Sequence, residues 1–222
     1  MYFYDSNYKL VRVPITDKIS HPLNSHRVYK TADGRCLKRF RIFPWQEPDL
    51  DFEQRLQDLQ LRHFFQIQEY LFNKSGDYRA FLMPFYKSSS KDVLTRSSDY
   101  LTDNFSEIFD SFEKLSSAFI EARDTNLENT IFTDQDIILI DTERYCDSPI
   151  NEKDSVRSAN YNEASWLLFS SLIRDTKNHV ELQDTDFYSW FCCQDGQDVC
   201  MALTQYKYPI DYMRCVKQKI KW

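Results

Sequence analysis

Glycine is scarce in this chain of 222 residues, where only Gly34, Gly76 and Gly196 occur. In many nucleotide sites a glycine-rich loop brings backbone amides close to the phosphates, because glycine has no Cβ and tolerates positive φ. The sequence therefore disfavours any site that depends on such a loop.

Long apolar runs are also missing. No stretch approaches the roughly 18 residues that a membrane-spanning helix needs, and the N-terminus MYFYDSNYKLVRV lacks the basic-then-apolar layout of a secretory signal. We expect no membrane span and a cytoplasmic protein. An export route without a cleaved signal would leave no mark in such a sequence.

The chain has no excess of positive charge. Its net charge is −6, so no global basic field exists to attract nucleic acid or anionic lipid, and we expect no nucleic-acid partner. The one local basic cluster, near the C-terminus, has the spacing of a solvated helix face, with a binding patch as the alternative. It consists of Arg214, Lys217, Lys219 and Lys221.

The six cysteines form no metal-binding pattern. No C-x-x-C pair occurs, and the four histidines do not lie at ligand spacing near them. We interpret the cysteines as reduced thiols of the core or the surface.

What the chain does contain is enough apolar and aromatic material to fold. Hydrophobic residues make up 42% and aromatic residues 16% of the sequence, which argues against a disordered chain. A length of 222 residues suits one domain or a unit of two lobes.

The first part of the sequence reads as strands. Residues 1–18 alternate loosely and predict one or two strands, and residues 23–43 predict a β-hairpin around the turn Asp33-Gly34. Lys38 lies in the second strand of that hairpin. By parity it shares the more apolar face with Cys36, Phe40 and Ile42, where an amine needs a partner or an anionic ligand.

A helix, a strand and a polar linker are expected next. Residues 50–72 show helical periodicity with Asp49 or Asp51 as N-cap, and Glu53 lies on or beside the apolar face, within reach of Lys38 or simply on the surface. Residues 78–86 predict a short buried strand. The polar stretch 87–98 then places a boundary between two lobes near residue 86.

The second part contains a group of polar residues at suggestive spacing. An amphipathic helix over 105–122 runs into Asp124, and Asn129 and Asp141 follow, with predicted strands at 129–132 and 137–140. Two carboxylates and a carboxamide can orient a hydroxyl group and bind magnesium, which is the chemistry of phosphoryl transfer. The same residue types also occur in ordinary hairpins.

The remaining segments predict helices. Residues 164–173 are apolar nearly all round and indicate a buried helix, and less regular helices are expected further on. These cover 187–193, 199–206 and 212–221.

Over roughly residues 19–175 this order of elements resembles the protein-kinase-like superfamily. The motifs behind the likeness are the RCLKRF strand, the helix with Glu53, the D-x-x-x-x-N loop from Asp124 and the aspartate of IDTE. The resemblance implies an α+β, two-lobed fold. It assigns residues 1–86 to a small antiparallel-sheet lobe, and residues 87–222 to a reduced, mainly helical lobe with its catalytic loop at 123–145.

The resemblance also implies roles for single residues. Lys38 would hold the α and β phosphates of ATP, and Glu53 would pair with Lys38. Asp124 would orient the acceptor hydroxyl and accept its proton. The metal ion, Mg²⁺ or Mn²⁺, would be held by Asn129 and Asp141, and the nucleotide would also contact Val28 and Met83.

The chain departs from the family in three ways. His21, Leu23 and His26 stand where typical kinases have glycines, Thr142-Glu143 replaces the F-G after the metal aspartate, and no A-P-E follows. Only 81 residues follow Asp141, since 222 − 141 = 81. This compactness is similar to the minimal kinases that some pathogenic bacteria deliver into host cells.

The likeness leads to one expected function and two alternatives. The first is an atypical minimal serine/threonine kinase that depends on ATP and magnesium. It would be a bacterial effector that acts on a host protein in the host cytosol. The I-D-T-E ending also fits a small-molecule or lipopolysaccharide-type kinase. The missing glycines fit a pseudokinase that serves as a binding module.

Overall fold

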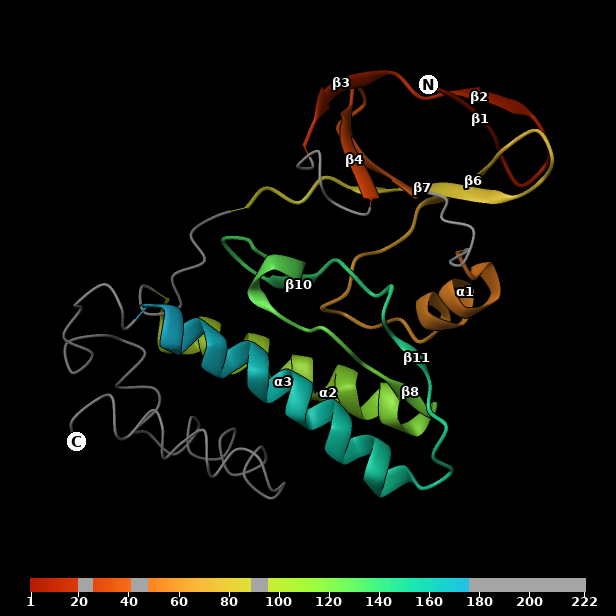
Figure 1. The fold of residues 1–222 in the computed structure, drawn as a ribbon. Coiled ribbons are helices and arrows are strands. Elements are labelled where there is room, and N and C mark those ends of the chain that lie inside the picture. The colour runs from red at the N-terminus through yellow and green to blue at the C-terminus, as the bar shows by residue number, and fades with distance from the viewer. Residues whose placement is uncertain (20–25, 41–47, 89–95, 176–222) are drawn as a thin grey trace, which may run out of the picture. The chain divides into compact units, whose positions relative to one another are not determined.

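The computed structural model describes residues 1–19, 26–40, 48–88 and 96–175. The chain divides into two compact units, which Figure 1 shows as ribbons. The first unit comprises residues 1–60 and 65–86, and the second comprises 61–64 and 87–222. Residues 61–64 thus belong to the second unit although the prediction placed them in the first lobe.

The first unit is built on one antiparallel sheet of seven strands, in the order β2-β1-β6-β7-β5-β4-β3. Strands β2 and β3 are the two edges, yet only Val13 and Pro14 separate them in sequence, so the sheet has to curl to bring its edges together. The strands are β1 (Tyr2–Tyr4), β2 (Leu10–Arg12), β3 (Ile15–Lys18), β4 (His26–Thr31), β5 (Arg35–Phe40), β6 (Glu69–Phe72) and β7 (Tyr78–Pro84).

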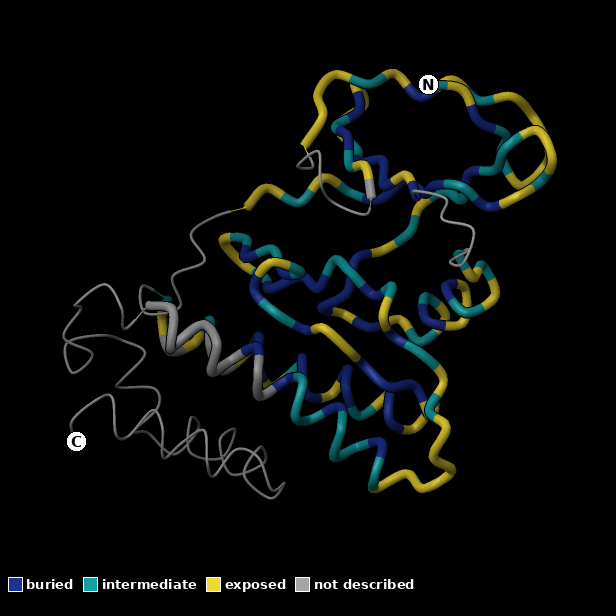
Figure 2. The backbone as a smooth tube through the Cα atoms, viewed as in Figure 1, coloured by how far each residue is buried: buried dark blue, intermediate teal, exposed yellow. Residues whose placement is uncertain are grey.

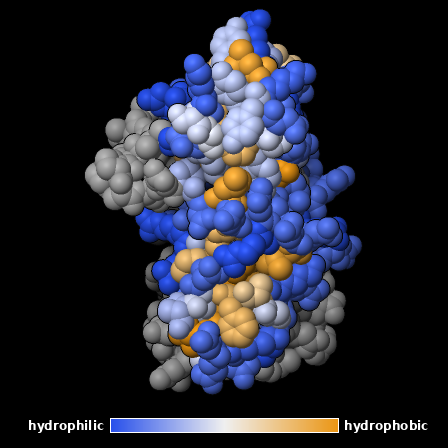
Figure 3. All heavy atoms as spheres, turned by 90° about the vertical axis from the view of Figure 1, so that its right-hand side faces the viewer, coloured by the Kyte–Doolittle hydropathy of each residue, from blue (hydrophilic) through white to orange (hydrophobic). Residues whose placement is uncertain are grey.

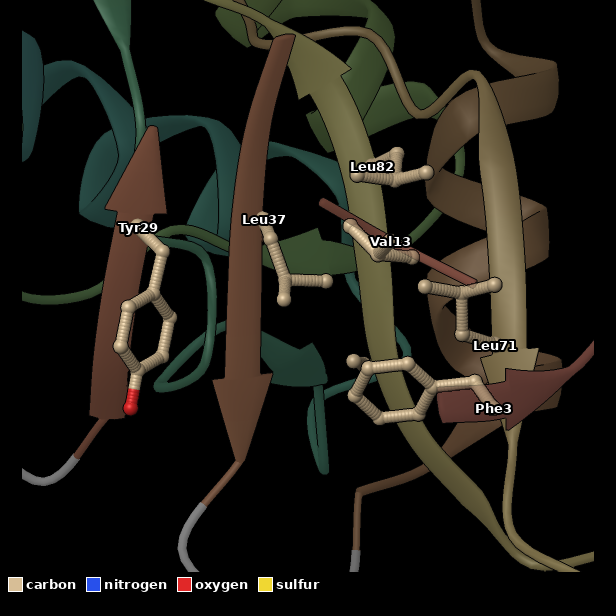
Figure 4. Close-up of a cluster of buried hydrophobic side chains, with 7 residues drawn as sticks. Phe3, Val13, Tyr29, Leu37, Leu71 and Leu82 are labelled. Carbon is tan, nitrogen blue, oxygen red and sulfur yellow. The ribbon is translucent and has the colours of Figure 1, made fainter. Parts of the chain in front are cut away.

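The concave side of this curled sheet holds an apolar core. Its side chains come from strands far apart in the sequence, and Figure 4 shows them pointing toward one another. The Met1 amino group and the Val13 carbonyl are 2.8 Å apart and help to hold the N-terminus at this core. The buried members of the core are Phe3, Val13, Tyr29, Leu37, Leu71, Ala80 and Leu82.

The predicted hairpin around Asp33-Gly34 is confirmed, with β4 and β5 paired in antiparallel register. Gly34 has φ +81°, a value that suits glycine. The Thr31 hydroxyl oxygen accepts from the Arg35 amide at 2.9 Å and also contacts the Arg35 carbonyl at 2.9 Å. Side-chain bonds therefore reinforce the turn that sets the register of Lys38.

The helix predicted over 50–72 is wrong in its length. Helix α1 (Leu50–Asp58) begins as expected, because the Asp49 carboxylate accepts from the Phe52 amide. It ends early: Gln60 has φ +49°, and residues 61–68 form a loop in which Leu61, His63, Phe64 and Phe65 are buried. Two side chains of the apolar spacing that predicted a helix are buried outside one, since Phe64 lies in this loop and Leu71 lies on β6.

The second unit contains two helices, α2 (Ser98–Ser117) and α3 (Lys153–Asp175), and four short strands. The sides of α2 and α3 that face each other are buried, and their outer sides are intermediate or exposed (Figure 2). The strands form two antiparallel pairs, which are β8 (Ile120–Glu121) with β11 (Cys146–Asp147) and β9 (Thr130–Phe132) with β10 (Ile137–Leu139).

The predicted helix over 105–122 is also shifted. Helix α2 begins at Ser98 and ends at Ser117, so it does not run directly into Asp124. Phe119 has φ +55°, which breaks the helix, and the chain continues as strand β8. The predicted strands near 129–132 and 137–140 are confirmed as β9 and β10. The predicted helix over 164–173 lies within α3, and those over 187–193, 199–206 and 212–221 lie outside the described residues.

The surface in Figure 3 is mainly polar, with hydrophobic side chains in several separate groups. In the described part of the chain, no helix is both long enough and apolar enough to cross a bilayer. Cys36 and Cys146 are free thiols, and the other cysteines lie outside the described ranges.

Candidate functional site

Lys38 lies in the middle of the sheet of the first unit. Strand β5 runs between β4 and β7, and Lys38 pairs with Val28 on one side and Phe81 on the other. The Lys38 residue is only 5% exposed. Its predicted position on an apolar face is confirmed, because Cys36 and Phe40 on the same face are buried too.

Three of the predicted nucleotide residues share one face of the sheet. Val28 is directly opposite Lys38, and Met83 is opposite Cys36, two residues away along β5. Residues opposite each other on antiparallel strands point to the same side, so Val28, Lys38 and Met83 lie on the side away from the apolar core around Leu37. Met83 is buried and Val28 is half-buried.

Burial on this face changes the acidity of the groups around Lys38 and Glu53. Burial raises the pKa of the Cys36 thiol to about 11, and the nearby charge of Lys38 acts in the opposite direction. Glu53 on α1 is 8% exposed. Burial raises the pKa of Tyr70 to about 12, and the charge of Glu53 adds to that shift. The pairing of Glu53 with Lys38 stays a prediction.

In the second unit, Asp124 and Asn129 are brought together by a compact polar loop. The Asn129 side-chain amide donates to the Asp124 carbonyl at 2.9 Å. Between them, Asn126 caps the 3-10 turn Leu127–Asn129, because its Oδ1 accepts from the amides of Glu128 and Asn129. The Asn126 Nδ2 also donates to the Asp124 carboxylate at 2.8 Å.

Asp141 follows strand β10 and lies next to this loop. The Ile140 amide donates to the Asn129 carbonyl at 3.0 Å, so the residue before Asp141 is bonded to Asn129. Asp141 is half-buried, as is Asn129, whereas Asp124 is exposed. All three residues that the sequence singled out in this region therefore converge within the second unit.

Residues 61–64 fix the strand that leads to Asp141. The Leu139 amide donates to the His63 carbonyl at 2.8 Å. The His63 ring is buried, with Nδ1 2.7 Å from the Ile137 carbonyl and Nε2 3.0 Å from the Glu107 carboxylate on α2. No local pattern pointed to this role, because His63 is 74 residues from Ile137.

Sequence reasoning missed a polar group that joins the loop to α3, in which Thr125 and Tyr145 are buried and Glu163 is half-buried. The Glu163 carboxylate accepts from the Thr125 amide at 2.8 Å, and the Thr125 and Tyr145 hydroxyls are 3.2 Å apart. Burial raises the pKa of Glu163, and the charge of Asp124 adds to that effect. Burial also raises the pKa of Tyr145, with further contributions from Glu163, Asp141 and Asp124.

Asn160 anchors the start of the loop to α3. Its Oδ1 accepts from the Ala122 amide at 2.7 Å, and its Nδ2 donates to the Ile120 carbonyl at 2.8 Å and the Ser116 hydroxyl at 3.0 Å. Asn160 is fully buried. Asn160 and Glu163 lie 38 residues from the groups they bind in the loop, so no local pattern could have revealed them.

Two arginines flank the loop. Arg123 pairs with Glu121 at 2.9 Å, and the pKa of Glu121 is lowered by its hydrogen bonds from Ser148 and Arg123. The Arg144 Nε is 3.5 Å from the Asp124 carboxylate, and the Arg144 side chain is 74% exposed. Of the two, Arg144 thus places a cationic group beside the Asp124 carboxylate.

The oxygen atoms near Asp124 fit magnesium better than zinc. Among the described residues, no group of three or more His, Cys, Asp or Glu could hold a metal ion. Mg²⁺, however, commonly uses one or two carboxylates and completes its shell with water and phosphate. Asp141 offers a carboxylate, and Asn129 offers Oδ1, since its Nδ2 is used by the Asp124 carbonyl.

These features define an α+β protein with a kinase-like fold, in which a curled antiparallel sheet is joined to a reduced helical part. No protein-family model matches the sequence, and no curated protein matches it either. The structure is similar to that of the Cydia pomonella granulovirus kinase PK-1. The TM-score is 0.51 and the identity is 14%, and the match covers 68% of this chain and 67% of that chain. The predicted fold class is confirmed.

Proposed function

We propose that this protein is a phosphotransferase that moves the γ-phosphoryl group of ATP to a hydroxyl group. The observation that supports this most directly is the convergence of Asp124, Asn129 and Asp141 in the second unit, through the Asn129–Asp124 and Ile140–Asn129 hydrogen bonds. A base for the acceptor and two oxygen ligands for magnesium are the groups that this reaction needs.

Each residue has a distinct part in the proposed reaction. The exposed Asp124 carboxylate orients the acceptor hydroxyl and accepts its proton. Asn129 and Asp141 would hold Mg²⁺, which, when bound, neutralises charge on the transferring phosphoryl group. Lys38 binds the α and β phosphates with Glu53 as its partner, and Val28 and Met83 contact the nucleotide.

The acceptor we propose is a serine or threonine of a protein, and the protein would act as a bacterial effector on a host target in the host cytosol. The sequence likeness to minimal effector kinases supports this choice. Of the three positions where the family has glycines, His21 and Leu23 lie outside the described residues and His26 begins β4. None of the three is a glycine, so the sequence offers no glycine-rich phosphate loop there. Lys38 therefore has the main part in binding phosphate in this proposal.

Substitution of the proposed groups tests the function. We expect Lys38→Ala and Asp141→Ala to lower the transfer of label from γ-labelled ATP by about 10²-fold or more. The exposed residues Lys74 and Asp134 supply the controls Lys74→Ala and Asp134→Asn, which should label as the parent does. Labelling by Lys38→Ala and Asp141→Ala at the rate of the parent would refute the proposal.

One alternative acceptor follows from the I-D-T-E sequence at Asp141, which resembles small-molecule and lipopolysaccharide-type kinases. Separation of the labelled products decides between the acceptors. Label that stays with protein, mapped to a serine or threonine by mass spectrometry, supports the protein kinase. Label in a small solute supports the alternative. A third outcome supports a binding module: the parent protein transfers no label, and millimolar ATP with magnesium does not shift its unfolding temperature.

A further inference from the structure

The backbone of Asp124 is in an unusual conformation for its residue type. Asp124 has φ +61°, in the left-handed region that few residues other than glycine adopt. Aspartate tolerates this region better than most residues, but the conformation still costs free energy and needs support from its surroundings. The residue proposed as the base is therefore held in place by something outside its own backbone.

The peptide group between Asp124 and Thr125 is held at both ends. Its carbonyl oxygen accepts from the side-chain amides of Asn129 at 2.9 Å and Asn126 at 3.1 Å. Its N–H donates to the Glu163 carboxylate at 2.8 Å. The orientation of this peptide plane depends on ψ of Asp124 and φ of Thr125, so these three side chains help to hold the backbone on the carboxyl side of Asp124 in place.

Glu163 is the only one of the three that comes from outside the loop, since it lies on α3. Thr125 is 2% exposed and Tyr145 is 5% exposed, so water has little access to the Thr125 amide to replace a lost acceptor. The Thr125 hydroxyl is 3.2 Å from that of Tyr145. Glu163 itself is half-buried, and this burial raises the pKa of its carboxyl group.

We propose that Glu163 is a positioning residue for Asp124. It holds the Asp124–Thr125 peptide by accepting the Thr125 N–H, and so keeps the Asp124 carboxylate aimed at the acceptor hydroxyl. The inference rests on the proposed phosphotransferase function. Loss of the acceptor frees this peptide to rotate and so shifts the backbone that carries the Asp124 side chain, and small displacements of a reacting group lower the rate strongly.

Three substitutions at position 163 separate the effect of the acceptor from those of charge and volume. Glu163→Gln keeps an oxygen acceptor without the charge. Glu163→Met keeps the volume without the acceptor, and Glu163→Ala removes both. Asp154→Ala is the control, because it removes an exposed carboxylate from the same helix.

The rate and the Michaelis constant should respond differently. We expect Glu163→Ala and Glu163→Met to lower kcat about 10- to 100-fold with an unchanged KM for ATP. Glu163→Gln should stay within about threefold of the parent, since its side chain still accepts the hydrogen bond, and Asp154→Ala should be unchanged. A kcat for both Glu163→Ala and Glu163→Met equal to that of the parent would overturn the proposal. So would a loss for Glu163→Gln as large as for Glu163→Met.

Amide exchange of Thr125, followed by NMR in the full chain, provides a readout without activity. The exchange should become faster in Glu163→Met and Glu163→Ala and stay slow in Glu163→Gln, while global unfolding temperatures stay similar. Unchanged exchange in Glu163→Met would overturn the proposal whatever the activity. The proposed phosphotransferase function is contradicted if the parent protein is inactive, or if the Asp124→Asn variant is as active as the parent. In either case the amide exchange rate of Thr125 still decides whether Glu163 holds the peptide.

Discussion

The two units hold their candidate residues in different ways. Lys38 lies on β5, an interior strand of the sheet. Its position is fixed by the pairing of β5 with β4 and β7, and the backbone hydrogen bonds of such pairing do not depend on particular side chains. Asp124 lies in a loop, where particular side chains replace the ladder. These are Asn126, Asn129, Asn160 and Glu163. A residue on a strand is positioned by register, whereas a residue in a loop depends on a few polar groups from elsewhere.

This comparison predicts that the first unit is most sensitive to loss of apolar volume. Leu37→Ala should lower the free energy of unfolding by about 2–5 kcal/mol, because Leu37 is fully buried in the core of the curled sheet. Urea unfolding at pH 7 measures the change. The control Leu10→Ala, at a side chain that is 56% exposed, should change stability by less than about 0.5 kcal/mol.

Hydrogen exchange then tests whether that effect is confined to one unit. Leu37→Ala should speed the exchange of β4, β5 and β7 amides more than that of α2 and α3 amides. A loss of under about 1 kcal/mol, below the range for buried leucines, would mean that apolar packing does not dominate the first unit.

The second unit should be most sensitive to the loss of a single polar side chain. Asn160→Ala removes the acceptor of the Ala122 amide and a donor to the Ile120 carbonyl and the Ser116 hydroxyl, although Ser116 still donates to the Phe112 carbonyl. Since each buried group without a partner costs about 1–3 kcal/mol and relaxation recovers part of this, we expect a loss of about 2–4 kcal/mol. Urea unfolding and the exchange rate of the Ala122 amide measure it.

A nearby asparagine on α3 offers a matched control. Asn162 is half-buried, and its Oδ1 has no hydrogen-bond partner among the described residues. Asn162→Ala should therefore change stability by less than about 1 kcal/mol. Equal losses for Asn160→Ala and Asn162→Ala would show that the three bonds of Asn160 have no special weight.

Sequence reasoning succeeded where the signal is local. The turn residues Asp33-Gly34 fixed the hairpin, and strand parity then placed Lys38 on its buried face. The spacing of Asp124, Asn129 and Asp141 pointed to one site because short strands and a single turn bring them together. Asn126 could have been found from its place as the cap of the turn.

Sequence reasoning failed where distant contacts override a local pattern. The apolar spacing continued past Gln60 and past Phe119, yet both residues adopt positive φ and end their helices. The apolar residues after these two positions lie in a loop or a strand instead. The roles of Asn160, Glu163 and His63 depend on partners that are 38 to 74 residues away, and polar residues on a helix normally indicate only a solvated face.

An ion pair between the helices of the second unit should have a smaller, pH-dependent effect. Arg157 on α3 donates to both carboxylate oxygens of Glu113 on α2, at 2.8 and 2.5 Å. The Arg157 guanidinium, as the main cause, lowers the pKa of Glu113. A carboxyl with a lower pKa in the folded state stabilises the protein above its unfolded pKa, and this contribution is lost as the pH falls through the folded pKa.

We therefore expect Arg157→Gln to lower the free energy of unfolding by about 1 kcal/mol at pH 7, because the bidentate pair is partly exposed. The difference from the parent should shrink as the pH falls below about 4.3, the ordinary value for glutamate. Urea titrations at several pH values measure it, with Asp110→Asn on the exposed side of α2 as the control. A difference independent of pH would mean that Arg157 acts through packing.

The smallest expected effect lies at the hairpin turn of the first unit. Hydrogen bonds from the side chains of Arg35 and Thr31 lower the pKa of Asp33 to about 2. As for Glu113, the pKa is lower in the folded state. The Asp33 carboxylate therefore stabilises the protein above its unfolded pKa of about 3.9, and this stabilisation is lost as the pH falls toward about 2. The Asp33 side chain is 44% exposed, so solvent screens its pair with Arg35.

Asp33→Asn should accordingly lower the free energy of unfolding by only about 0.2–1 kcal/mol at pH 7. Asparagine is also favourable in turns, so the substitution removes the charge and keeps the backbone. The loss of stability in Asp33→Asn should become smaller in about 1 M salt, where the Debye length is about 3 Å. The loss of stability in Leu37→Ala should not change with salt. Urea unfolding with and without salt measures both. A loss for Asp33→Asn as large as that for Leu37→Ala would contradict the view that backbone register and apolar packing, rather than side-chain polar bonds, hold Lys38 in place.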